Sequence, residues 1–328
     1  MKDKFIAVLI LLIFSAGVVS SVMHLMRKPK PEKKEMPGFD ISLGKGKKQL
    51  MVIHVYGPIM TAGDSGGITG SGVSGSDAIV GQLKNARNSD NVCGVVLRIN
   101  SPGGTVAATQ EIYHEILKLR EAGKPVTVSM ADVAASGGYY ISCAADKIYA
   151  NGGTMTGSIG VIIGLPSLKG LFEHVGIDYQ VIASGKWKDM GSMARDLKPE
   201  ERDAFKKIIM DTYGQFLQVV KKGRLAAVRA KGHTEQDLES YAQGQIFSAV
   251  DAEKKGLIDG IATYEDVIKK TWKMAGQKGS PRVTTPRKNF LKQLIRLVER
   301  ESKGSLISKE ALNSFKEIRV EYRYVPGI

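Results

Sequence analysis

Cysteine is nearly absent from this chain of 328 residues. The two that occur, Cys93 and Cys143, have apolar or small neighbours, so a disulfide framework is excluded, although a single bridge is not. Neither cysteine has the CxxC spacing or the neighbouring histidines that a zinc site needs. We therefore expect two buried free thiols, no metal and no other cofactor.

Acidic residues are also in short supply, because 33 Asp and Glu face 47 Lys and Arg and leave a net charge of +14. Such an excess of positive charge is found in many proteins that bind nucleic acid. However, the central region has no basic face interleaved with aromatic residues, which argues against nucleic-acid binding. Residues 278–328 alone hold 12 Lys and Arg against 5 Glu. Attraction to anionic lipid is a simpler account of the excess.

Charge is missing altogether from residues 5–26, apart from His24. This run is long enough to span a bilayer and longer than the apolar core of a usual signal peptide. We predict an uncleaved N-terminal transmembrane helix within residues 1–26, with a signal peptide cleaved near Ala16 as the alternative. Lys and Arg flank both ends, so charge alone leaves the orientation open. Residues 27–47, charged and with Pro and Gly, are typical of a juxtamembrane linker.

Beyond residue 48, short apolar segments alternate with amphipathic ones. Strands are expected at 49–56, 92–100, 124–131, 146–150 and 178–184, and helices at about 76–89, 105–122, 137–145 and 199–222, with two more helices and a short strand in 247–271. This alternation predicts an α/β domain with a largely parallel sheet over residues 48–275. The GxGxxG match at residues 70–75 follows no strand, so we interpret it as a loop.

The composition changes again at residue 276, where a basic C-terminal tail, 276–328, begins. Residues 289–303 have the pattern of an amphipathic basic helix, and residues 318–328 could be extended. Such a tail can lie on a membrane, pack on a neighbour or stay disordered.

Ser136 is the first candidate for chemistry, within "ADVAASGGYY", residues 131–140. Small flanking residues allow a tight turn that presents its hydroxyl, and the amide of Gly137 could face a developing oxyanion. The segment does not match the GxSxG pattern, however. Taken locally, a serine that caps the following helix is the more ordinary interpretation.

Gly103 and Gly104 of "SPGG" form a second candidate. A strand ends there, and the two glycines would open the next helix with unpaired, accessible amides suited to an oxyanion or a peptide carbonyl. An ordinary strand-to-helix turn explains the same residues equally well.

A general base is harder to find, because none of the five histidines lies in a loop of small residues. They are His24, His54, His114, His174 and His233. A lysine can replace histidine when burial or cationic neighbours favour its neutral form. Lys188 follows an expected strand in a glycine-containing loop, with Lys186 as its rival, although a lone lysine is ordinarily a solvated surface residue.

Five segments in order carry a family resemblance: "RINSPGG", "ADVAASGGYYIS", "TGSIGVI", "SGKWKDMGS" and "GLIDGI". Together they resemble signal peptide peptidase A in its short bacterial form, over roughly residues 48–270. The resemblance implies a serine/lysine peptidase on the fold of the crotonases and the caseinolytic protease, with its repeated β-β-α units. It also implies that Ser136 is the nucleophile, that Lys188 rather than Lys186 is the general base, and that Ser158 orients the lysine.

The same resemblance implies an oxyanion hole made by the amide of Gly137 with that of Gly103 or Gly104. It implies a ring-like homo-oligomer whose active sites are shared between subunits. It further implies a catalytic domain on the extracytoplasmic side of the cell membrane, acting on remnant signal peptides and other short hydrophobic peptides.

The tail lies outside the shared region, and we expect its extended end to bind in the peptide groove of its own chain. Two alternatives to the peptidase remain open at this point. One is a crotonase-like acyl-CoA enzyme, which an anchor and missing paired carboxylates disfavour. The other is a non-catalytic membrane scaffold that binds peptides.

Overall fold

The computed structural model describes residues 46–61, 75–286 and 320–323, all within one unit that spans Phe39–Ile328. The predicted anchor, nearly all of the linker and of the GxGxxG segment, and most of the tail lie outside these ranges. Within the described ranges, no helix combines the length and apolar content needed to cross a bilayer. The transmembrane helix within residues 1–26 therefore stays a prediction.

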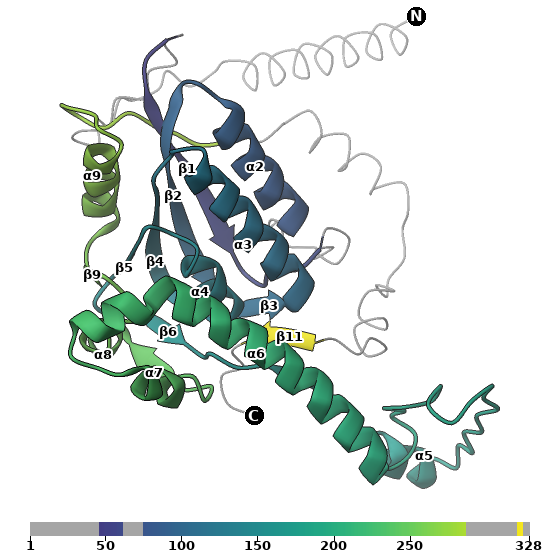
Figure 1. The fold of residues 1–328 in the computed structure, drawn as a ribbon. Coiled ribbons are helices and arrows are strands. Elements are labelled where there is room, and N and C mark those ends of the chain that lie inside the picture. Colours follow the sequence, from purple (N-terminus) through teal and green to yellow (C-terminus); the bar gives the residue numbers. More distant parts are fainter. Residues whose placement is uncertain (1–45, 62–74, 287–319, 324–328) are drawn as a thin grey trace, which may run out of the picture. The chain divides into compact units, whose positions relative to one another are not determined.

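A parallel sheet forms the centre of the domain (Figure 1). Its strands run in the order β10-β1-β2-β4-β5-β9, and every pair along this path is parallel. These strands are β1 (Gln49–Tyr56), β2 (Val92–Ser101), β4 (Val126–Ala135), β5 (Lys147–Ala150), β9 (Gly260–Ile261) and β10 (Val283–Thr284). Beyond its contact with β5, β4 pairs with β6 (Met155–Gly157), to which β8 (Ile246–Ser248) adds antiparallel. The predicted α/β fold with a largely parallel sheet is confirmed.

Helices cover both faces of this sheet. The helices of the described ranges are α2 (Ser76–Asn88), α3 (Val106–Glu121), α4 (Gly137–Ser142), α5 (Lys169–His174), α6 (Pro199–Ala230), α7 (Glu235–Tyr241), α8 (Ala249–Lys254) and α9 (Tyr264–Met274), of which α5 lies apart from the sheet (Figure 1). Figure 1 shows α2 and α3 on one face and α9 on the other. The helices expected at 76–89 and 105–122 are confirmed to within one residue at each end, whereas α6 runs eight residues beyond the expected end at Lys222.

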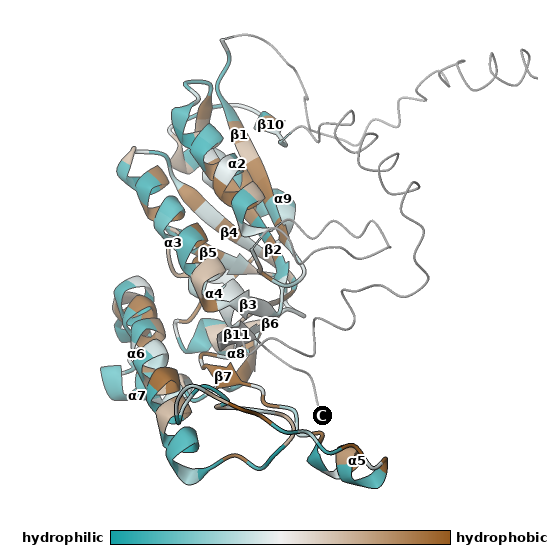
Figure 2. Cartoon of the chain, turned by 90° about the vertical axis from the view of Figure 1, so that its right-hand side faces the viewer, coloured by the Kyte–Doolittle hydropathy of each residue, from teal (hydrophilic) through white to brown (hydrophobic). Residues whose placement is uncertain are grey.

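Burial on both faces explains why β1 and β2 are almost continuously apolar. Alternate residues point to opposite sides of a strand. Ile53 and Leu97 accordingly join the core beneath α2 and α3, whereas Val52 and Val96 pack with α9 through residues such as Trp272. Figure 2 shows both strands as largely apolar and the surrounding helices as mixed.

A second, smaller sheet contains β3 (Gly103–Thr105), β7 (Ile162–Ile163) and β11 (Val320–Arg323), in the order β3-β11-β7. β11 comes from the C-terminal tail and is antiparallel to both neighbours. Its register places Tyr322 opposite Gly104 and Val320 opposite Ile163. The extended conformation expected in the tail is thus confirmed for residues 320–323.

The prediction of a strand at 178–184 is wrong. Residues 178–184 are exposed and pair with no described strand. An alternating apolar segment becomes a strand only where another strand satisfies its backbone hydrogen bonds. In this segment, the apolar residues face solvent in the single chain.

The prediction that Gly103 and Gly104 open a helix is also wrong. Both lie in β3, and α3 begins only at Val106. The backbone of Ile59 donates to the Gly103 carbonyl (2.8 Å) and accepts from the Thr105 N–H (2.9 Å). Pairing with β11 on one side and the bridge to Ile59 on the other therefore replace the helical turn that the sequence suggested.

Arg224, only 3% exposed, ties α6 to the sheet. Its guanidinium donates to the Gly256 carbonyl (3.0 and 2.8 Å) and to Asp259 Oδ2 (2.8 Å), which also accepts from the Ile148 N–H of β5 (2.8 Å). Burial opposes ionisation of Asp259, but Arg224, the Ile148 N–H and Lys147 outweigh it and lower the pKa of that carboxyl.

We expect Asp259→Asn to lower the free energy of unfolding by about 3 kcal/mol at pH 7, because it leaves the Arg224 charge buried and uncompensated. A carboxyl whose pKa is lower in the folded state stabilises the fold above its unfolded-state pKa of about 4. That contribution disappears as the pH falls through the lowered folded value. Urea unfolding at pH 7 and pH 3 should therefore show a difference between the two proteins that shrinks at pH 3.

Lys147→Gln is the matched control. The Lys147 ammonium lies 3.0 Å from the same carboxylate but is half exposed, so its loss should cost less than about 1 kcal/mol. Equal losses in the two variants would contradict the role assigned to Arg224.

Candidate active site

Ser136 and Ser158 follow directly on two neighbouring parallel strands. β4 ends at Ala135 and β6 at Gly157, and these two residues are register partners. The Ser136 N–H donates to the Gly157 carbonyl (2.8 Å). Parallel pairing therefore brings together two serines that are 22 positions apart in the sequence.

Ser136 has a strained backbone, with φ 52° and ψ −114°. Positive φ is uncommon outside glycine and costs free energy that the surrounding structure must supply. The side chain is fully buried, and its Oγ has no hydrogen-bond partner among the described residues. Ser136 does precede α4, but its side chain makes no capping bond, so the interpretation of this serine as a helix cap is wrong.

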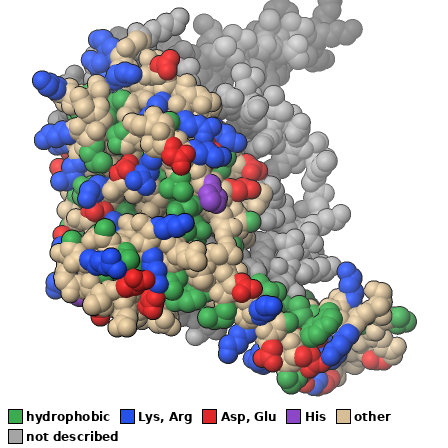
Figure 3. All heavy atoms as spheres, viewed as in Figure 1, with side chains coloured by type: hydrophobic (Ala, Val, Ile, Leu, Met, Phe, Trp, Pro, Cys, Tyr) green, Lys and Arg blue, Asp and Glu red, His purple; other side chains and the backbone are tan. Residues whose placement is uncertain are grey.

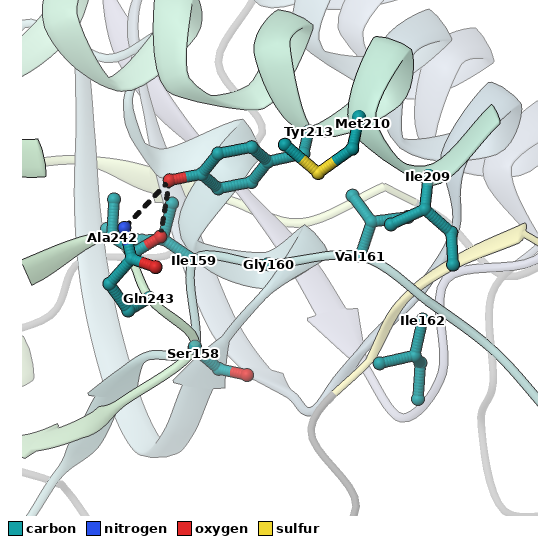
Figure 4. Close-up of a pocket in the computed structure, with 11 residues that line it drawn as sticks. Ser158, Ile159, Gly160, Val161, Ile162, Ile209, Met210, Tyr213, Ala242 and Gln243 are labelled. Carbon is teal, nitrogen blue, oxygen red and sulfur yellow. Dashed lines mark hydrogen bonds between the residues drawn. The ribbon is translucent and has the colours of Figure 1, made fainter. Parts of the chain in front are cut away.

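Ser158 shares this conformation, with φ 50°. Its N–H donates to the Gln245 carbonyl (2.6 Å), and its side chain lines a pocket of about 510 Å³. Val161 and Ile162 from the next segment, with Met210 from α6, make the wall largely apolar (Figure 4). The second serine thus lies between Ser136 and an apolar cavity.

Gly104 and Gly137 bring their backbones together beside Ser136. A Cβ atom built on Gly137 would lie 3.2 Å from the Gly104 nitrogen and 2.8 Å from Thr109 Oγ1. A Cβ on Gly104 would lie 1.9 Å from the Ile59 carbonyl oxygen. The backbone of Ile59 therefore requires glycine at position 104, and a side chain at position 137 would have to displace Thr109 and crowd the Gly104 nitrogen.

The amides of Gly103 and Gly104 differ in their partners. The Gly103 N–H donates to Ser101 Oγ (3.1 Å), a fully buried hydroxyl. Ile59 engages the residues on either side of Gly104, so the N–H and C=O of Gly104 point the other way, toward β11. The Gly104 N–H therefore faces β11, whereas the Gly103 N–H is already bonded to Ser101 Oγ.

Lys188 is not brought to either serine within the described chain. It lies in a turn closed by its own N–H and the Gly185 carbonyl (3.1 Å), and its side chain is exposed. Lys186, its rival, forms an ion pair with Glu200 (3.3 Å). One copy of the chain therefore holds the candidate nucleophile and the candidate base apart.

The remaining candidate groups are the histidines, the two cysteines and possible metal ligands. Because Ser136 Oγ has no partner among the described residues, no described histidine contacts it. Both cysteines are free, Cys93 partly and Cys143 fully buried, and burial raises the pKa of Cys143 to about 12, which keeps that thiol protonated at neutral pH. In the described ranges, no group of three His, Cys, Asp or Glu could hold a metal ion.

On the face shown in Figure 3, basic and acidic side chains are intermixed rather than gathered into a basic stripe. Among the described residues, many cations are already paired with acids, as in Arg120–Asp146 (2.7 Å) and Lys169–Asp196 (2.6 Å).

Sequence reasoning missed two supporting residues. Ser101, whose hydroxyl accepts from Gly103, and Thr109, which packs on Gly137, are both fully buried polar residues. The signal available for Ser101 was its place directly before Pro-Gly-Gly, where a hydroxyl commonly bonds the backbone two residues on. No local pattern singles out Thr109.

An α/β fold that presents a strained, unpaired serine at a strand-to-helix junction, beside close glycine amides, is typical of serine hydrolases. Comparison with known proteins narrows this class. The model of peptidase family S49 matches residues 118–278, and the model of the Clp proteases matches residues 70–155.

The chain is 39% identical over 209 residues to a protein named as a protease in Synechocystis sp., covering 64% of this chain and 73% of that protein. It is 34% identical over 225 residues to a protein named as signal peptide peptidase SppA in Enterococcus faecium (69% and 63%). It is 33% identical over 229 residues to Protease 4 of Salmonella typhi, of which it spans only 35% while 70% of this chain is covered. The chain belongs to peptidase family S49 and is a serine protease, which confirms the resemblance found in its motifs.

We expect Gly104→Ala to destabilise the protein by about 2 kcal/mol or more and to reduce peptide cleavage, because its methyl group would collide with the Ile59 carbonyl. Urea unfolding and a peptide-cleavage assay measure the two effects. Gly81→Ala, in α2 with open space around it, is the control and should gain about 0.5 to 1 kcal/mol. A Gly104→Ala protein as stable as the wild type would contradict the close pairing with Ile59.

Proposed function

We propose that this protease is a membrane-anchored endopeptidase that cleaves remnant signal peptides and other short hydrophobic peptides through an acyl-enzyme. The observation that carries the proposal is Ser136, a buried serine held at positive φ with an unpaired hydroxyl beside Ser158 and the Gly104 and Gly137 backbones. Strain and a missing hydrogen bond both cost stability, and they persist where they serve a reaction.

In the proposed reaction, Ser136 Oγ attacks the peptide carbonyl and its proton passes to the neutral amine of Lys188. The amides of Gly104 and Gly137 donate to the oxyanion. The Lys188 ammonium then protonates the leaving amine. Water, deprotonated by the same lysine, releases the acyl group from Ser136. Ser158 hydrogen-bonds the lysine and orients it.

The lysine in this scheme comes from a neighbouring copy. A lysine acts as a base only when burial or nearby cations favour its neutral form, and Lys188 is exposed in a single copy. The segment around it also exposes large apolar side chains: Leu171, Val175, Ile177, Tyr179, Val181, Ile182 and Trp187. So much exposed apolar surface is typical of an interface. A ring-like homo-oligomer would bury it and carry each Lys188 to a neighbour's Ser136.

The peptide groove of this proposal lies between β3 and β7. β11 occupies that place as an antiparallel strand, opposite Gly104 on one side and Ile162–Ile163 on the other. An extended substrate can pair with the same two edges, because backbone pairing is independent of the side chains. The tail is therefore a self-bound ligand that competes with substrate.

The proposed organisation is an anchor at 1–26, a linker at 27–47, the peptidase domain at 48–275 and the tail at 276–328. A single-pass anchor would hold the domain at the extracytoplasmic surface of the cell membrane. There it would meet signal peptides, the substrate that the name of the Enterococcus faecium relative gives for that protein.

We expect Ser136→Ala and Lys188→Ala each to reduce peptide cleavage by at least about a thousandfold, because each removes a group that acts in both chemical steps. Lys186→Ala is the matched control and should remain active. The rate of the wild type should rise toward alkaline pH as the base loses its proton. Mixed oligomers assembled from the two inactive variants should regain part of the activity, since some sites then combine an intact serine with an intact lysine.

Full activity in Lys188→Ala would refute the dyad, and a failure of mixing to restore cleavage would refute the shared site. A serine-directed phosphonate should add to Ser136 in the wild type, as shown by intact mass. No adduct would favour the peptide-binding scaffold instead.

We expect Tyr322→Pro to lower the KM for peptide substrates about tenfold and to leave kcat unchanged. Proline removes the backbone N–H at the position opposite Gly104, and a tethered ligand competes at millimolar effective concentration. Steady-state kinetics measure the effect, with Tyr322→Phe, which keeps the N–H, as control. An unchanged KM in the proline variant would show that the tail does not compete for the groove.

A further inference from the structure

The segment that carries Lys188 has little regular structure to hold it. Between α5 and α6, residues 175–198 contain turns and bends but no helix or strand. A catalytic lysine must nevertheless be presented within a fraction of an ångström of its working position. The question is which contacts hold this turn on the rest of the chain.

Arg195 makes most of these contacts. Its Nε donates to Asp189 Oδ2 (2.8 Å) and its Nη2 to the Asp189 carbonyl (3.1 Å). On its other side, Nη1 and Nη2 donate to the two oxygens of Glu201 (2.9 and 2.5 Å), and Nη1 also reaches the Asp196 carbonyl (3.0 Å). The Arg195 guanidinium thus links Asp189, the residue next to Lys188, to Glu201.

Glu201 attaches Arg195 to the long helix α6. It lies in the first turn of α6, is 1% exposed, and its Oε2 also accepts from the Lys198 N–H (3.1 Å). A carboxylate at this position is favoured by the positive end of the helix dipole. The chain of contacts therefore runs from the Lys188 turn through Asp189 and Arg195 to a long helix.

Two exposed ion pairs of the same segment are ordinary surface contacts and serve as a comparison for Arg195. Lys169–Asp196 and Lys186–Glu200 each join largely exposed side chains through one contact. Arg195 differs from both, because it binds a buried carboxylate with two parallel bonds, the geometry that gives Arg pairs their specificity. A lysine in its place could not make the fork.

The link through Arg195 also has an electrostatic consequence. Asp189 is adjacent to Lys188, and an unpaired carboxylate there would attract the ammonium and hold its proton. Arg195 occupies Asp189 and lowers the pKa of that carboxyl, and its hydrogen bond to Glu201 lowers the pKa of Glu201 as well. Other charges near the turn include Lys198, the paired Lys186 and Glu200, and the paired Lys169 and Asp196.

We infer that Arg195 is a positioning residue for the general base: it fixes the 185–190 turn on α6 and keeps the Asp189 carboxylate away from Lys188. The inference rests on the proposed role of Lys188. It assigns no contact between Arg195 and the substrate.

The test compares Arg195→Gln, Arg195→Lys and Lys169→Gln in the full-length protein. We expect Arg195→Gln to lower kcat about a hundredfold with an unchanged KM, and to move the alkaline rise in rate to higher pH. Arg195→Lys should be intermediate, and it keeps the charge should Arg195→Gln fail to fold. Lys169→Gln, which removes an exposed ion pair of the same segment, should match the wild type.

The double variant Asp189→Asn, Arg195→Gln separates positioning from a general loss of structure. Removing the freed carboxylate should return the pH profile to that of the wild type, although part of the loss in kcat should remain. A double variant with the same displaced profile would overturn the inference. So would an unchanged kcat and profile in folded Arg195→Gln or Arg195→Lys.

Lys188→Ala distinguishes this failure from a failure of the proposed function. If Lys188→Ala is inactive while the Arg195 variants behave as wild type, only the role of Arg195 is wrong. If Lys188→Ala is active, the dyad itself is wrong, and the inference about Arg195 is wrong with it.

Discussion

The parallel pairing of β4 with β6 is the constraint on which the candidate site depends. Because Ala135 and Gly157 are register partners, the two residues that follow, Ser136 and Ser158, emerge together with positive φ. The Ser136 N–H is held by Gly157, and the Ser136 carbonyl accepts from Tyr140 in α4. These bonds, in a fully buried setting, supply the free energy that the strained backbone requires. The serine is thus held in a conformation that it would not adopt in an isolated peptide.

One copy of the chain does not bring its candidate nucleophile and its candidate base together. A single chain buries its candidate nucleophile and exposes its candidate base, with a band of apolar side chains around the latter. The same chain places its own β11 between β3 and β7. In the proposed function, both features restrain the peptidase, because activity needs assembly to bring Lys188 and displacement of the tail to admit substrate. In that proposal, such restraint would protect folded proteins from cleavage.

Much of the fold was predictable for a physical reason. β1 and β2 are apolar on both faces because helices cover both faces, so their sequence is distinctive, and α2 and α3 have clear amphipathic periods. The failures have an equally physical cause. Residues 178–184 have the alternation of a strand but no partner strand, and Gly103–Gly104 form a strand because β11 and Ile59 lie alongside. Local pattern carries no information about a partner distant in the sequence.

The sequence by itself determined the α/β class, the family and the candidate site residues, because these follow from apolar periodicity and from ordered motifs such as "SPGG" and "AASGGYY". Only the tertiary structure decided between a helix cap and a strained, unpaired Ser136, and it alone gave the Gly103 and Gly104 amides different partners. It also decided that Arg195 joins the Lys188 turn to Glu201. Each of these depends on which backbone or side-chain groups meet across the fold, and hydrogen bonds between distant residues arise only when packing brings their partners together.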